Sequence, residues 1–310
     1  MLVVIALGGN ALLRRGEPLD PDVQRRNVAA AAAVVATVAL EHRVVVTHGN
    51  GPQVGLLALQ NEAVRDAPRW PLDVLDAQSA GMLGYLLEQE LGRHLGADRV
   101  ATLLTQVVVD ADDPAFSRPS KPVGPVYTED EAKAVATERG WAVAPDGASW
   151  RRVVASPEPR RLVGLATVRR VVAGGTTVVC AGGGGIPVVA DGRGGLRGVE
   201  AVVDKDLSAG LLARGLEADA LVILTDVAHV VDGWGTAHER PLGETTPAEL
   251  RRLDLAAGSM GPKVEAACRF VESGGRFAVI GSLDDAAAVV RGEAGTVVRP
   301  ALAPATRAPC

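Results

Sequence analysis

Short continuous runs of apolar residues alternate along this chain with longer stretches in which apolar residues recur every three or four positions. The short runs are rich in Val, Ile, Leu and Ala, and they predict β-strands at residues 2–7, 43–47, 99–109, 176–180, 220–224, 276–280 and 296–299. Because these runs are continuous rather than alternating, we expect both faces of each strand to be buried. The pattern therefore favours an α/β fold, with a largely parallel sheet between layers of helices.

The longer stretches predict helices at residues 22–40, 72–95, 128–139, 162–172, 204–216, 263–273 and 284–291. Asp20 or Asp22 is expected to cap the first of them, because each follows a proline at a typical helix start. Gly81 and Gly84 predict that the second helix is split or loosened.

Two segments interrupt this alternation. Residues 111–159 are rich in proline, tryptophan and charge, with a predicted hairpin at 141–155 that turns at Asp146-Gly147. We expect this segment to be an inserted subdomain or lid. Residues 188–199 predict a second hairpin, turned at glycines.

The composition is that of a globular protein, with 47% apolar and 22% charged residues. At roughly 150 residues per domain, the length suggests two domains or one large α/β domain. Thirty-two basic and thirty-seven acidic residues give a net charge of −5, which argues against a nucleic-acid binder with a basic face.

No membrane or export segment is expected. The longest near-apolar run, at 28–40, is shorter than the about twenty residues that a membrane span needs, and no basic region precedes the apolar start. Cys180, Cys268 and Cys310 form no CxxC pair. They favour neither a disulfide framework nor a zinc site, and they fit a cytoplasmic protein.

Lysine is scarce in this chain. Of the thirty-two basic residues only four are lysine, and the other twenty-eight are arginine. A preference for arginine codons explains the composition, but the remaining lysines can mark places where a compact ammonium is required. Lys133 lies in the predicted helix 128–139 and is expected at its surface, whereas Lys121, Lys205 and Lys263 lie in loops or at helix starts.

Three glycine-rich polar loops follow predicted strands, at residues 8–10, 48–53 and 182–185. Ligands of open parallel sheets bind at the carboxyl ends of strands, where glycines and helix starts present N–H groups to anions. These loops predict a phosphate or carboxylate ligand. The P-loop, dinucleotide-binding, zinc-protease and nucleophile-elbow motifs do not occur in the chain.

The lysines at two predicted helix starts favour a catalytic role. Lys205 stands between Asp204 and Asp206, and Lys263 follows Gly261-Pro262. A cation is unfavourable at the positive end of a helix, so capping alone does not account for either lysine. Separate ammonium groups, glycine loops and an organising aspartate are what phosphoryl transfer requires.

Seven motifs together resemble the amino acid kinase family, and within it the carbamate kinases. They are GGNAL at 8–12, THGNGPQVG at 47–55, KPVGPVY at 121–127, AGGGGIPV at 181–188, VEAVVDKDL at 199–207, LTDV at 224–227 and GSMGPKVEAA at 258–267. They occur in order over nearly the whole chain.

The resemblance implies a three-layer αβα sandwich with a mostly parallel central sheet, working as a homodimer. An N-terminal part, 1–215, would bind carbamate or carbamoyl phosphate and carry the lid at 111–159, and a C-terminal part, 216–310, would bind ATP or ADP. The implied reaction, ATP plus carbamate giving ADP plus carbamoyl phosphate, is reversible. It uses Mg²⁺ on the nucleotide and runs towards ATP in arginine fermentation.

The resemblance also implies roles for individual residues. Lys121 and Lys205 would neutralise the transferred group, Asp206 would orient the lysines, and Lys263 would act on the leaving ADP. Related kinases carry a lysine just before the first Gly-Gly. This chain has Ala6-Leu7 there, so Lys121 is the candidate to replace it. Substrate-binding positions would be Gly8, Gly9, Asn10, Gly49, Asn50 and Gly51, and nucleotide-binding positions would be Gly183, Gly184, Thr225, Asp226, Met260, Gly261 and Lys263.

The chain departs from the family pattern at 228–235 on the nucleotide side, and Glu158 stands where a basic residue is expected. Two alternatives remain open: another amino acid kinase acting on a carboxylate such as N-acetylglutamate or on UMP, and a non-catalytic nucleotide or anion sensor. The lack of a lysine near residue 6 argues against the first, and the retained lysines argue against the second. A dehydrogenase is more remote, because no GxGxxG follows the first strand.

Overall fold

A computed structural model describes residues 1–14, 16–63, 68–255 and 259–301. Within these residues one eight-stranded sheet has the order β15-β17-β16-β12-β1-β2-β9-β3. Its neighbours are parallel except for the pair β16–β17. The strands are β1 (Leu2–Leu7), β2 (Arg43–His48), β3 (Val100–Leu103), β9 (Thr177–Cys180), β12 (Ala220–Thr225), β15 (Glu244–Thr245), β16 (Phe277–Ser282) and β17 (Thr296–Val298).

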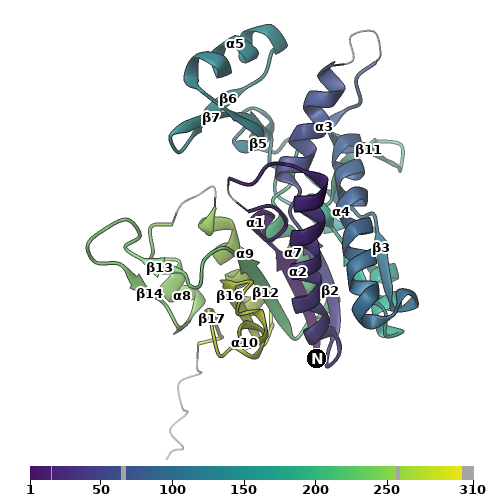
Figure 1. Cartoon of the computed structure of the whole chain (residues 1–310), viewed down its shortest axis with the longest axis vertical. Coiled ribbons are helices and arrows are strands. Elements are labelled where there is room, and N and C mark those ends of the chain that lie inside the picture. Colours follow the sequence, from purple (N-terminus) through teal and green to yellow (C-terminus); the bar gives the residue numbers. More distant parts are fainter. Residues whose placement is uncertain (15, 64–67, 256–258, 302–310) are drawn as a thin grey trace, which may run out of the picture.

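Helices cover both faces of this sheet (Figure 1). On one face lie α6 (Leu165–Ala173), α7 (Lys205–Leu216), α8 (Pro247–Leu250) and α9 (Met260–Glu272), and on the other lie α1 (Gly9–Leu12), α2 (Pro21–Ala39), α4 (Leu72–Leu95) and α10 (Ala286–Arg291). A separate hydrophobic core lies on each face of the sheet. Successive residues of β1 point to opposite faces, so Val4 packs into the core under α6–α9 and Ile5 packs into the core on the other face. The expected αβα sandwich is confirmed, and most predicted elements are present with ends shifted by a few residues.

The prediction that the helix at 72–95 is split or loosened is wrong, because α4 is one continuous helix of 24 residues. Gly84 serves close packing instead. A Cβ at this position would collide with the side chain of Thr102 on β3, and the Thr102 hydroxyl donates to the Gly84 carbonyl at 3.0 Å. The glycine therefore brings helix and strand together without breaking the helix.

The predicted single strand at 99–109 is also wrong. β3 ends at Leu103, and β4 (Gln106–Val108) belongs to a second sheet of order β11-β10-β4-β8. Thr105 lies between them, where its hydroxyl accepts the N–H of Ala181 at 3.1 Å and its carbonyl accepts the N–H of Ile186 at 2.9 Å. The other strands of this sheet are β8 (Arg161–Leu162), β10 (Ile186–Ala190) and β11 (Leu196–Gly198), and the last two form the hairpin predicted at 188–199.

The insertion carries a separate antiparallel sheet of order β5-β7-β6, which stands beyond the main sheet at the top of Figure 1. Its elements are β5 (Lys121–Tyr127), α5 (Glu129–Arg139), β6 (Val143–Asp146) and β7 (Ser149–Val154). The predicted helix and the hairpin at Asp146-Gly147 are confirmed. Lys121, which was expected in a proline-braced loop, begins β5. This strand tolerates prolines because it lies at a sheet edge.

Three further features complete the fold. Helix α3 (Gly51–Ala63) was not predicted, since Gly51, Pro52 and Gly55 weaken its helical pattern. A small hairpin joins β13 (Val231–Asp232) to β14 (Arg240–Pro241), and short 3-10 turns occur at Ala97–Arg99, Pro114–Phe116 and Gly182–Gly184. Among the described helices, none has the length and apolar character to cross a membrane.

Candidate active site

The three glycine-rich loops, at residues 8–10, 48–53 and 182–185, and the end of β12 meet at one edge of the main sheet. They follow β1, β2, β9 and β12, which are adjacent parallel strands, and Leu7 pairs with both His48 and Leu224 in the register. The Gly8 N–H donates to the Leu224 carbonyl at 2.8 Å, and the Gly49 N–H donates to the Leu7 carbonyl at 3.1 Å. The three glycine-rich loops therefore lie together at this edge, and the anionic ligand that they predict stays a prediction.

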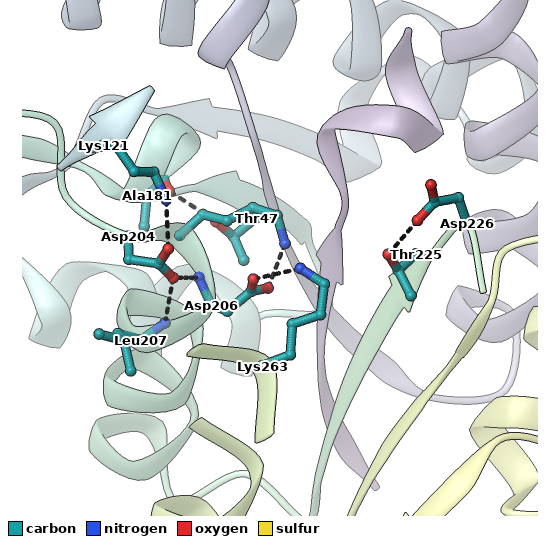
Figure 2. A network of polar contacts seen from close by, with 10 residues as sticks. Thr47, Lys121, Ala181, Asp204, Asp206, Leu207, Thr225, Asp226 and Lys263 are labelled. Atoms are coloured by element: carbon teal, nitrogen blue, oxygen red, sulfur yellow. Dashed lines mark hydrogen bonds and ion pairs between the residues drawn. The ribbon is translucent and has the colours of Figure 1, made fainter. Parts of the chain in front are cut away.

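Lysine side chains from three separate elements converge on two aspartates at the start of α7 (Figure 2). Asp206 holds two of them, since its Oδ1 accepts from Lys205 and its Oδ2 accepts from Lys263 Nζ at 2.9 Å. Asp204 Oδ2 accepts from Lys121 Nζ at 2.5 Å. The structure therefore brings the four predicted catalytic side chains, from β5, α7 and α9, into one cluster.

The centre of the cluster is buried, with Lys205 and Asp206 only 9% and 3% exposed, while Lys121 and Lys263 are part-buried. Burial lowers the pKa of Lys205, and Asp206 opposes this shift. Burial by itself would raise the pKa of Asp206, but Lys205 and Lys263 outweigh it and hold the pKa below its usual range. Burial also works against the charge of Lys263, yet Asp206 outweighs it and raises that pKa. Asp206 thus stays ionised between two ammonium groups.

Asp204 is a site residue that the sequence analysis treated only as a helix cap. It does cap α7, because its Oδ1 accepts the N–H groups of Asp206 at 2.9 Å and Leu207 at 3.3 Å. Its other oxygen pairs with Lys121. Within this cluster, three ammonium groups pair with two carboxylates, and Asp226 at the end of β12 also acts on Lys263. Three ammonium groups at one place offer several N–H donors to an anionic ligand.

The expected nucleotide-binding positions are distributed around this cluster. Thr225 and Asp226 lie at the end of β12, apart from the lysines in Figure 2, and the Thr225 hydroxyl donates to Asp226 Oδ1 at 3.1 Å. Met260 and Gly261 open α9, the helix that carries Lys263. Gly183 and Gly184 lie in the 3-10 turn after β9, where Gly183 packs against Asn50.

The expected substrate-binding loops lie against the lysine cluster. A Cβ added to Gly49 would lie 3.2 Å from the Gly9 nitrogen and 3.3 Å from Lys205 Cδ. Gly9 and Gly51 are the first residues of α1 and α3, so helix starts follow both loops. The side chain of Asn10 lies outside the described part of the structure, and its predicted role stays a prediction.

Asp76 and Ser79 of α4 are functional candidates that the sequence analysis missed. Asn50 Nδ2 donates to Asp76 Oδ1 at 2.5 Å and to Ser79 Oγ at 2.7 Å, and both partners are fully buried. The sequence did hold a signal, because both polar residues fall on the buried face of the helix between Leu72, Leu75 and Leu83. Burial raises the pKa of Asp76 to about 7.

Among the described residues, no group of three or more His, Cys, Asp or Glu side chains is arranged to hold a metal ion. His48 is buried, burial lowers its pKa to about 4, and its Nδ1–H donates to the Gly49 carbonyl at 3.2 Å. Cys180 and Cys268 are buried free thiols. Burial raises their pKa values to about 12 and about 11. Cys310 lies outside the described residues.

Comparisons with known proteins agree over nearly the whole chain. A model of the amino acid kinase family matches residues 1–282. The chain is 52% identical over 302 residues to a carbamate kinase of Rhizobium meliloti (strain 1021), a match that covers 96% of this chain and 93% of that relative.

Solved structures give the same result. The fold is similar to carbamate kinase from Giardia lamblia bound to citric acid, with a TM-score of 0.91, 40% identity and coverage of 97% of this chain and 98% of that one. It is also similar to the Giardia lamblia enzyme bound to AMP-PNP, with a TM-score of 0.87, 40% identity and the same coverage.

The first prediction concerns the bridging carboxylate. Asp206→Asn leaves the ammonium groups of buried Lys205 and part-buried Lys263 without their anion, so we expect the free energy of unfolding to fall by about 3–5 kcal/mol. Urea unfolding at neutral pH measures this loss. Asp232→Asn is the matched control, because its pair with Arg240 is exposed and we expect a loss below about 1 kcal/mol. Equal losses in the two variants would contradict a special role for Asp206.

The second prediction concerns the pH dependence of stability. The folded pKa of Asp76 lies above its ordinary value near 4, so its contribution to stability is complete below pH 4 and is lost as the pH rises to about 7. One pKa unit corresponds to about 1.4 kcal/mol, so ionising Asp76 in the folded protein costs on the order of 4 kcal/mol. Asp76→Asn cannot ionise. We expect the stability of this variant to rise relative to the parent between pH 4 and pH 8, as measured by urea unfolding. A constant difference would show that Asp76 does not titrate in this range.

Proposed function

This chain belongs to the amino acid kinase family, and we propose that it catalyses reversible phosphoryl transfer between ATP and carbamate, giving ADP and carbamoyl phosphate. The observation that carries the proposal is the convergence of Lys121, Lys205 and Lys263 on two aspartates beside the glycine loops. Carbamate as the substrate is supported by the relatives that match over nearly their whole length, because these are carbamate kinases. The enzyme class, a kinase, follows from the same similarity.

The arrangement suits the charge changes of this reaction. A phosphoryl group in transfer spreads negative charge over its equatorial oxygens and must be held in line between donor and acceptor. We assign Lys205 and Lys121 to the transferred group and Lys263 to the leaving ADP. Because Asp206 fixes Lys205 and Lys263 before the ligand arrives, little reorganisation is needed in the transition state. The N–H groups of Gly9 and Gly51, the first residues of α1 and α3, supply further donors to the phosphoryl and carbamoyl groups.

The nucleotide is assigned to the C-terminal side of the site. A solved relative with a TM-score of 0.87 is bound to AMP-PNP, which supports binding of ATP and ADP here. We propose contacts from Gly183, Gly184, Thr225, Asp226, Met260 and Gly261, together with Lys263. Residues 1–215 would then supply the carbamoyl side, together with the nucleotide contacts of Gly183 and Gly184, and residues 216–310 would supply the rest of the nucleotide side.

We propose that Mg²⁺ enters with the nucleotide and is held mainly by phosphate oxygens. Both carboxyl oxygens of Asp206 are engaged by lysines, and those of Asp204 by Lys121 and the start of α7. These carboxylates are therefore poorly placed to supply a metal site of their own. The ion would neutralise phosphate charge in the transition state. A cytoplasmic location and a flux towards ATP in arginine fermentation are part of the same proposal.

One assay tests the function directly. Purified protein is incubated with ADP, Mg²⁺ and carbamoyl phosphate, and ATP is measured, with acetyl phosphate as the comparison donor. We expect ATP from carbamoyl phosphate at far lower donor concentration than from acetyl phosphate. No ATP from carbamoyl phosphate would contradict the proposal and favour a sensor, whereas transfer to N-acetylglutamate or UMP would identify another kinase of the family.

We propose that the exposed apolar surface of α4 forms a homodimer interface. Met82 and Tyr85 are exposed three residues apart on this helix, and exposed Leu104 lies next to it, beside Gly81. β3 is the terminal strand of the main sheet within the described residues, so this apolar surface adjoins a sheet edge open to pairing. Sedimentation velocity tests the proposal, because Tyr85→Glu should shift the protein from dimer to monomer.

We propose that the insertion is a lid over the phosphoryl site. Its first strand packs closely on α3, since a Cβ at Gly55 would collide with the Gly124 backbone. Within the insertion, Arg151 Nη2 of β7 donates to the Gly124 carbonyl of β5 at 2.6 Å. Its first strand delivers Lys121 to the cluster. A lid of this kind excludes water from the reacting group.

Removing the outer part of the lid tests this role. Residues 128–148 are replaced by a short Asn-Gly turn that keeps β5, β7 and Lys121. We expect ATP synthesis to fall at least about tenfold, while hydrolysis of carbamoyl phosphate without ATP formation increases. Measurement of both products from one reaction separates the two effects. A shortened protein with full turnover would refute the lid.

Lys205→Arg tests whether the site requires a compact cation. The guanidinium is larger and planar, and it would pair bidentately with a neighbouring aspartate. We expect turnover to fall at least about tenfold, or 1.4 kcal/mol, with an unchanged melting temperature. Lys133→Arg is the control, because Lys133 lies on the surface of α5 and pairs with Glu129. Full activity of Lys205→Arg would mean that lysine scarcity does not mark the site.

Two alanine variants test the assignment of the lysines to the two substrates. Lys263→Ala should raise the KM for ADP more than the KM for carbamoyl phosphate, and Lys121→Ala should do the reverse. Initial rates are measured with each substrate varied at a saturating level of the other. Equal effects on both substrates in both variants would reject the assignment.

A further inference from the structure

The amide of Asn50 is held from one side by α4. Its Nδ2 donates to Asp76 Oδ1 at 2.5 Å and to Ser79 Oγ at 2.7 Å. An amide nitrogen carries two N–H donors, so both are used by these contacts. All three side chains are buried, with Asn50 only 2% exposed.

The acceptors on α4 fix which end of the amide faces the helix. The Ser79 hydroxyl donates to the Asp76 backbone carbonyl at 2.9 Å, so towards Asn50 it can only accept. Asp76 Oδ1 accepts as well, whether the carboxyl is ionised or carries a proton on Oδ2. Oδ2 is buried and has no hydrogen-bond partner among the described residues. Turning the amide over would place its oxygen against two acceptors and leave its donors unpaired, which is unfavourable in a buried site.

The glycine loop after β9 holds the other face of the same amide. Gly183 has φ 70°, and a Cβ there would collide with the Asn50 amide group. The neighbouring Gly49 lies against Gly9 and the Lys205 side chain. The amide is therefore fixed from two sides, in a loop that touches the lysine cluster.

We propose that Asp76 and Ser79 are positioning residues that present the Asn50 amide oxygen to the ligand as a hydrogen-bond acceptor. An acceptor fixed at this point selects a ligand that carries an –NH₂ group, and so a carbamoyl group over an acyl group of the same shape. The inference rests on the proposed function for the identity of the ligand. Carbamoyl phosphate and acetyl phosphate differ at this point only in –NH₂ against –CH₃. A site built to pair with a donor rejects the analogue that lacks it, because the acceptor is then left unpaired.

The test is the ratio of kcat/KM for carbamoyl phosphate to kcat/KM for acetyl phosphate, with ADP and Mg²⁺, in the full-length protein. Asp76→Leu removes the acceptor and lets the amide turn, so we expect the ratio to fall by about 10–100-fold. Asp76→Asn keeps an oxygen at the Oδ1 position and should retain most of the ratio. Glu88→Leu, a change of the same kind elsewhere on α4, should leave the ratio unchanged.

The outcomes separate the inference from the proposed function. If the parent enzyme forms no ATP from carbamoyl phosphate, the proposed function fails, and the inference fails with it. If the parent is active but Asp76→Leu lowers both efficiencies equally, Asp76 is merely structural and the inference alone is overturned. Should Asp76→Leu not fold, Ser79→Ala decides, because it removes one of the two contacts. A lower ratio with an unchanged melting temperature supports the inference, and an unchanged ratio overturns it.

Discussion

The arrangement of the site depends on one buried carboxylate that binds two ammonium groups, one on each of its oxygens. Asp206 accepts from Lys205 through one oxygen and from Lys263 through the other. Burying charges is expensive unless they are paired, and the pair of cations by itself would be repelled from a helix start. The single anion makes both lysines tolerable at the same place. It thereby fixes α7 and α9 relative to each other at their first turns, and the glycine loops pack against the start of α7.

The order of the strands explains why these parts can meet. Strands from residues before 216 form one half of the main sheet and strands from later residues form the other, with β1 and β12 at the junction. Parallel pairing brings the loops after β1, β2, β9 and β12 to one edge. The substrate and nucleotide sides of the proposed reaction therefore lie in different halves of the chain but share a single rigid sheet.

The central strands and the clustered lysines could be predicted from the sequence, because both leave a pattern within a few neighbouring residues. Continuous apolar runs identify buried strands, and lysines at helix starts stand out against a chain that otherwise uses arginine. The division of residues 99–109 could not be predicted, since it depends on contacts of Thr105 with a loop more than seventy residues away. Asp204 was recognised only as a cap, because its partner Lys121 comes from the insertion. Asp76 was missed because an aspartate in a helix usually faces solvent, and only its position on the apolar face marks it as buried.

The scarcity and placement of lysine also determine which side chains react with amine-modifying reagents. Lys133 has a side chain that is 62% exposed, whereas the side chains of Lys121, Lys205 and Lys263 are at most 28% exposed and are paired with carboxylates. A reagent that acylates amines therefore finds one accessible lysine, on α5 at the outer end of the insertion, besides the chain's own α-amino group. A dye or a resin coupled through a lysine in this way is attached on α5 and leaves the three clustered lysines unmodified.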